Sequence, residues 1–151
     1  MTRFFAPGAP APQGSKRYVG NGRMIESSPH VKPWRDKVRA KAQHAHNGPA
    51  IIGAVDVRIR FWMPRPTYHY GTGRNAGRIK PQYVDAEHIT KPDLDKLVRA
   101  VLDAITEERR VGHVTRRGVI RDDSQVVRLD PAKNYADRFA GIEVTVTERK
   151  P

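Results

Sequence analysis

The 151-residue sequence contains no cysteine, has few aromatic residues (7%) and has fewer acids than bases. The absence of cysteine excludes disulfides and thiolate zinc sites, and it suits a reducing compartment. No apolar run approaches the roughly 18 residues of a membrane span, and the N-terminus lacks the apolar core of a signal peptide. We therefore expect a cytoplasmic protein with no membrane partner.

The charge of the chain is strongly one-sided. Lysine and arginine number 28 against 16 acids, which gives a formal net charge of +12. A charge of this size favours a polyanionic partner such as nucleic acid. The length allows one modest hydrophobic core, so we expect residues 1–151 to form a single domain.

The clearest element is a helix over residues 90–105. Its apolar side chains recur at the spacing of one buried stripe, and they are Leu94, Leu97, Val98, Val101, Leu102 and Ile105. Pro92 suits the first turn of a helix, because its φ is fixed and it lacks an N–H. The pattern predicts a helix that begins near Pro92 and buries one face.

Two acids, Asp93 and Asp95, lie at the start of this helix. One interpretation is helix-terminus chemistry, since carboxylates favour the first turn and Thr90 with Asp93 resembles a capping box. The other is a shared ligand. Residues two apart on an ideal helix diverge by roughly 200°, whereas in an extended segment they point the same way. The pair can share a ligand only if the chain is still entering the helix at Asp93.

A second acidic pair, Asp122-Asp123, comes shortly before the apolar Val126-Val127. Carboxylate oxygens are the ligands that hard cations prefer. Four carboxylates at the ends of two elements, in a chain this basic, therefore suggest a cation site.

The motifs resemble those of the RusA family of Holliday junction resolvases. They are Lys-Pro-Asp-Leu-Asp-Lys-Leu at 91–97, then Asp103-Ala104, then Asp122-Asp123-Ser124-Gln125-Val126. A looser likeness extends to residues 7–17 and to the C-terminal strand. The resemblance implies catalytic, metal-binding carboxylates at Asp93, Asp95 and Asp123, and it places the family's basic helix residue, a lysine, on Arg99.

The resemblance also implies a homodimer that uses one or two Mg²⁺ ions per subunit, with Mn²⁺ as a substitute and no organic cofactor. Its substrate would be a four-way DNA junction, cut symmetrically on two strands in a bacterial or phage-infected cell. Two alternatives stay open: a non-catalytic basic DNA-binding accessory protein, and a nuclease that acts on other branched DNA or on RNA.

The remaining elements predict an α+β domain with a small mixed sheet and two main helices on one face. A period-two pattern predicts strands, and Gly20-Asn21-Gly22 predicts a hairpin turn. The expected elements are a short strand at 3–5, a hairpin at 16–25, a helix at 31–46, and strands at 55–63, 125–129 and 142–147.

Two segments, 64–90 and 107–121, show no usable periodicity and carry many arginines. We expect flexible basic loops that grip DNA; the alternatives are a disordered insertion for the first and a hairpin for the second. The residues expected to contact DNA are Lys16, Arg17, Lys91, Arg116 and Arg117.

Overall fold

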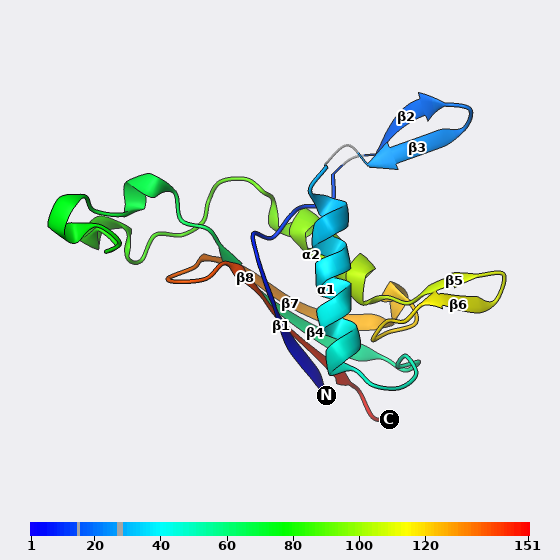
Figure 1. Ribbon diagram of the computed structural model, residues 1–151. Helices are drawn as coiled ribbons and strands as arrows, with labels where there is room; N and C mark the ends of the chain where they lie inside the picture. Colours follow the sequence, from blue (N-terminus) through cyan, green and yellow to red (C-terminus); the bar gives the residue numbers. More distant parts are fainter. Residues whose placement is uncertain (15, 27–28) are drawn as a thin grey trace.

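The computed structural model describes residues 1–14, 16–26 and 29–151, with the backbone alone for 16–19 and 23–26. A four-stranded sheet has the order β1-β8-β4-β7, and two helices cover one of its faces (Figure 1). The elements are β1 (Thr2–Pro7), α1 (Val31–Ala45), β4 (Val55–Met63), α2 (Leu94–Ile105), β7 (Val126–Tyr135) and β8 (Gly141–Glu148). The α+β prediction is confirmed.

The hydrophobic core lies between the sheet and the helices. Every second residue of β4, from Val55 to Met63, is buried, as its alternating sequence predicts. Strands β1 and β8 add side chains to the same layer, and the helices close it. The most deeply buried core residues of these other elements include Val31, Val38, Leu97, Val101, Ile105, Ile142, Val144 and Val146.

The direction of α2 follows from the pairing of β4. This strand is antiparallel to β8 but parallel to β7, and a parallel pair needs a crossover, here built around α2. Lys133, near the end of β7, donates from Nζ to the carbonyls of Thr90 and Pro92, both at 2.9 Å. At the other end, Val119 N–H donates to the Ile105 carbonyl at 2.7 Å. Helix α2 therefore runs antiparallel to β7.

Two boundaries differ from the sequence expectation. Helix α2 begins at Leu94, so Pro92 lies before the N-cap residue Asp93 and outside the first turn. Strand β7 has 10 residues and extends through Pro131 to Tyr135, well past residue 129. Pro131 is compatible with a strand here because β7 lies at the edge of the sheet.

Two short antiparallel hairpins complete the strands. The predicted hairpin at 16–25 is confirmed as β2 (Lys16–Gly20) paired with β3 (Arg23–Glu26), with Asn21 and Gly22 at φ values of 52° and 69° in the turn. Of the alternatives for 107–121, the structure shows a hairpin, β5 (Glu108–Arg110) paired with β6 (His113–Arg116). None of the helices among the described residues is long and apolar enough to cross a membrane.

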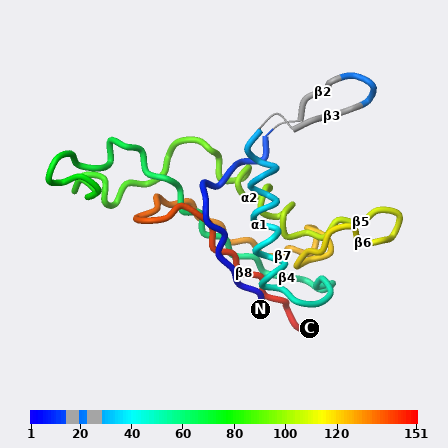
Figure 2. Tube along the Cα trace, in the orientation of Figure 1, coloured from blue at the N-terminus to red at the C-terminus, as the bar shows by residue number. Residues whose placement is uncertain are grey.

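Residues 64–90, called the arm below, project from the sheet at the end of β4 (Figure 2). The arm contains three single-turn helices, η1 (Thr67–His69), η2 (Gly73–Asn75) and η3 (Pro81–Tyr83). Backbone hydrogen bonds join its two sides, for example from Lys80 N–H to the His69 carbonyl at 2.8 Å. A disordered insertion does not describe this segment.

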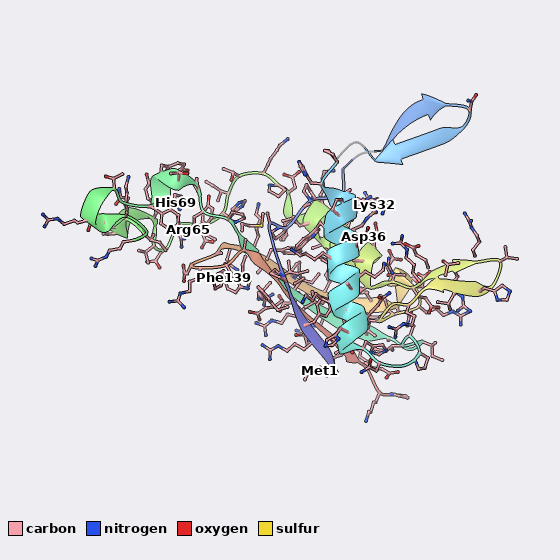
Figure 3. All side chains as sticks on the ribbon, in the orientation of Figure 1. Met1, Lys32, Asp36, Arg65, His69 and Phe139 are labelled. Carbon is pink, nitrogen blue, oxygen red and sulfur yellow. The ribbon has the colours of Figure 1, made fainter. Side chains whose placement is uncertain are left out.

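The root of the arm is organised around Arg65, whose side chain is 2% exposed. It donates to the carbonyls of Ala136 and Tyr83 and to Nδ1 of His69 (3.0, 2.8 and 3.2 Å). Arg65 and His69 lie together at this root (Figure 3). The His69 ring stacks on Tyr83 with ring centroids 4.4 Å apart. Because a guanidinium only donates, Nδ1 of His69 accepts and the ring is neutral.

Acidification should loosen the arm before the rest of the domain. Burial, and then the Arg65 cation, lower the pKa of His69. Because the pKa of His69 is lower in the folded protein than in the unfolded chain, protonation favours unfolding of the arm. The arm therefore has its full stability above about pH 6.5 and becomes less stable as the pH falls below that value. Hydrogen exchange from pH 7.5 to 5.5, corrected for intrinsic rates, should show protection falling first in residues 64–90. His69→Gln should reduce this dependence but not remove it, because burial also lowers the pKa of His88 in the same segment. Replacing the exposed His113 should leave it unchanged.

Candidate functional site

Asp93 and Asp95 lie where the chain enters α2. Asp93 is the N-cap residue with extended backbone angles (φ −69°, ψ 141°), and its side chain makes no capping hydrogen bond. Both acids are exposed. The condition for a shared ligand is met, because Asp93 still belongs to the extended segment. The capping-box interpretation of Thr90 with Asp93 does not apply, since the N-cap residue of α2 is Asp93 and not Thr90.

Basic residues surround this acidic pair. Asp93 borders a hollow that is also lined by Lys91, Lys96, His30 and prolines of the 9–12 segment. The ammonium of Lys133 is held close to Asp93 by its hydrogen bonds to the carbonyls of Thr90 and Pro92. Two acids among three lysines leave the surface attractive to phosphate while they supply oxygen ligands.

Asp95, Arg99 and Asp103 form the expected stripe along α2. Arg99 is exposed one turn beyond Asp95 and makes no ion pair with any described residue. Asp103 lies within 3.7 Å of Arg35 on α1, and its carbonyl accepts a hydrogen bond from Arg39. Asp103 therefore helps to join the two helices, whereas Arg99 points to solvent.

The second acidic pair caps a short turn, η4 (Asp123–Gln125), that leads into β7. Asp122 accepts a hydrogen bond from Ser124 N–H at 2.8 Å, and Gln125 accepts one from Asp122 N–H at 2.7 Å. Hydrogen bonds donated by the side chain and the backbone N–H of Ser124 lower the pKa of Asp122. Asp122 is thus committed to the turn, and Asp123 stands beside it, exposed.

The two acidic pairs lie at opposite ends of α2. Asp93 and Asp95 are at its start, and Asp123 follows the segment that bonds to its end. The 12 residues of α2 span about 18 Å, whereas Mg²⁺ holds its ligands at about 2.1 Å. No group of three metal-ligating side chains occurs among the described residues. Carboxylates are suitable donors for Mg²⁺, but Asp93, Asp95 and Asp123 of one chain do not fit around one ion.

The expected DNA contacts on the β5–β6 hairpin differ in their surroundings. Arg116 pairs with Asp36 of α1 at 3.2 Å and with Glu108 at 3.6 Å. Arg117 uses its carbonyl to accept from Arg39 and Gln43, while its side chain is exposed. The side-chain charges of Arg117 and Lys91 are therefore more available to DNA than the charge of Arg116. The side chains of Lys16 and Arg17 lie outside the described part of the chain.

Sequence reasoning did not identify Lys133 or Tyr135. Lys133 positions the segment before Asp93, and Tyr135 contacts His69, His88 and Arg65 at the root of the arm. Both occur in Pro131–Tyr135, where proline and asparagine obscure the strand pattern. The only signal in the sequence was their position shortly after the strand that was predicted to end at residue 129.

A net charge of +12 and exposed acids at the start of α2 are features expected of an enzyme that acts on nucleic acid, and comparison with known families identifies such an enzyme. Residues 7–147 match the family described as endodeoxyribonuclease RusA. The chain therefore belongs to the RusA family, whose members are hydrolases that cut DNA phosphodiester bonds at Holliday junctions.

A bacterial relative covers nearly the same length. The chain is 28% identical over 153 residues to the "Uncharacterized protein YqaN" of Bacillus subtilis (strain 168). The alignment covers 97% of this chain and 95% of the relative.

Replacing Arg117 and Arg116 separately should distinguish free charge from paired charge. Arg117→Ala removes an exposed cation and keeps its backbone bonds, so the slope of log affinity against log salt should become less steep by roughly one unit. Arg116→Ala should change the slope less, because Asp36 and Glu108 already offset its charge. The measurement is fluorescence anisotropy with a four-way junction at several KCl concentrations. Arg149→Ala, at the far C-terminus, serves as the control, and equal slopes for all three variants would contradict this difference.

Proposed function

We propose that this protein resolves Holliday junctions by Mg²⁺-dependent, paired and symmetric cleavage of two DNA strands. One observation carries the proposal: Asp93 and Asp95 are exposed at an extended helix entry, uncommitted to capping, among Lys91, Lys96 and Lys133. Acids in a phosphate-facing surface repel DNA unless a cation joins them. The family's action on DNA phosphodiester bonds supports the same conclusion.

The chemistry requires an activated water, an electrophilic phosphorus and a stabilised leaving oxygen. A Mg²⁺ ion held by carboxylates would supply these by lowering the pKa of a bound water and neutralising charge that develops on phosphate. Asp93 and Asp95 would hold one or two ions, with Mn²⁺ as a possible substitute, whereas Asp123 of the same chain lies at the other end of α2 and cannot join them there. Lys91 and Lys96 would bind the phosphates that flank the cleaved bond.

Arg99 would contact the scissile phosphate. It lies one turn beyond Asp95 on the exposed face of α2, and it makes no ion pair with any described residue. A guanidinium so placed can donate two parallel hydrogen bonds to a phosphate, and these strengthen as charge builds in the transition state.

Asp95→Asn should abolish cleavage of a labelled junction while binding stays intact or tightens, because the change removes a metal ligand and one negative charge near phosphate. Asp103→Asn is the matched control on the same helix and should cut near normally, since Asp103 faces Arg35. Cleavage by Asp95→Asn at saturating Mg²⁺ would refute the assignment. Junction, duplex, flap and RNA substrates in one panel separate a resolvase from a nuclease of other specificity.

Arg99→Ala should lower the single-turnover cleavage rate by about 10²-fold, the scale of losing one charged transition-state contact. Junction affinity should change little, because one cation among many is removed. Arg99→Lys should retain activity, since the RusA resemblance places a lysine at this position. A severe loss of activity in Arg99→Lys would instead indicate that a bidentate contact from the guanidinium is required. An unchanged rate for Arg99→Ala would remove Arg99 from the site.

A further inference from the structure

The tip of the arm, residues 70–79, is a compact turn with internal hydrogen bonds. Its two sides are bridged, and the Gly71 N–H donates to the Arg78 carbonyl at 2.9 Å. Gly71 packs so closely on Asn75 that a Cβ at this position would lie 2.7 Å from the Asn75 Cβ, so only glycine fits. A surface that is ordered before binding loses little conformational entropy when it binds a partner.

The charge of the arm beyond its root is of one sign. Residues 66–84 contain the cations Arg74, Arg78 and Lys80 and no acid. Arg74 and Arg78 are exposed, and neither makes an ion pair or a side-chain hydrogen bond with any residue that the structure describes. They differ in this from Arg116, whose charge is offset by two acids. A cationic projection without acids suits a polyanion, and the polyanion on which the RusA family acts is DNA.

The tip lies apart from the acids of the proposed site. At the root, Arg65 donates to the Tyr83 carbonyl, so the root separates the tip from residues 85–92, which lead to Asp93 and Asp95. Figure 1 shows the arm and the β5–β6 hairpin projecting from the helices in opposite directions. A DNA molecule bound at the two acids would therefore meet the tip at a different phosphate from the one that is cut.

The root connects the tip to the strand that also supports the acids. The centroid of the Tyr135 ring lies 4.7 Å from that of His69 and 5.4 Å from Cζ of Arg65. Tyr135 is two residues from Lys133 on β7, and Lys133 holds the segment before Asp93. The positions of the tip and of the acids are therefore set by the same strand.

We propose that the tip of the arm is a second DNA-binding surface, which binds backbone phosphates of the junction apart from the cleaved bond. Arg74 and Arg78 supply the charge, and the root fixes their position relative to Asp93 and Asp95. Because the contact is to phosphates, it is independent of base sequence. This inference rests on the proposed action on four-way junctions, but it does not depend on which residues hold the metal ion.

Arg74→Ala combined with Arg78→Ala tests the charge of the tip and leaves its backbone unchanged. The slope of log affinity for a four-way junction against log salt should become less steep by about two units, and affinity should fall by roughly 10-fold or more at low salt. Lys41→Ala combined with Lys150→Ala is the charge-matched control, because both lysines are exposed and lie outside the arm. Equal changes in the two double variants, or no change in the arginine variant, would overturn the proposal.

Removal of the tip tests where the contact is made. Because Tyr70 and Ile79 form an antiparallel bridge, residues 71–78 can be replaced by an Asn-Gly turn that leaves the root intact. In hydroxyl-radical footprinting of a four-way junction without Mg²⁺, the wild-type chain should protect a group of nucleotides separate from those at the cleavage position. The trimmed chain and the arginine double variant should both lose protection of that group alone. Footprints identical to the wild type in both would contradict a contact at the tip.

Both measurements report binding without Mg²⁺, so they are separate from the test of the proposed cleavage. If the wild-type chain does not cut junctions in Mg²⁺ but protects the separate group of nucleotides, the cleavage assignment fails and the contact at the tip stands. If the wild-type chain cuts junctions and the arginine double variant binds them with unchanged affinity and slope, the cleavage assignment stands and the contact at the tip is wrong.

Discussion

The parallel pairing of β4 with β7 is the constraint on which the rest of the structure depends. Antiparallel neighbours can be joined by a tight turn, but a parallel pair requires the chain to return across the sheet. Helix α2 makes this return, and its buried stripe closes the core over β4. The crossover places Asp93 and Asp95 near the C-terminal end of β7 and Asp122 and Asp123 directly before its N-terminal end. The arm and the β5–β6 hairpin are the two connections of this crossover, one before α2 and one after it.

Periodicity in the sequence identified the elements with a buried face. Strand β4 alternates strictly and α2 has an unbroken apolar stripe, so both could be predicted from residue type alone. Strand β7 was predicted to be half its length, because it lies at an edge, is partly exposed on both faces and contains Pro131. The start of α2 was predicted too early, because a proline is compatible both with the first turn of a helix and with the residues before it. The acids at 93 and 95 could be identified from the motif, but their distance from Asp123 depends on strand direction, which short-range patterns do not contain.

The net charge of the chain overstates the charge that is available to DNA. Arg65 is enclosed at the root of the arm, and Arg39 is buried between α1, the end of α2 and Glu108. Both guanidiniums donate to backbone carbonyls near the ends of helices and strands, a role for which a planar group with five donors is well suited. Buried arginines of this kind position the arm and the β5–β6 hairpin. Exposed arginines such as Arg99 and Arg117 are available to bind phosphate. Composition indicates the class of partner, whereas burial decides which cations can bind it.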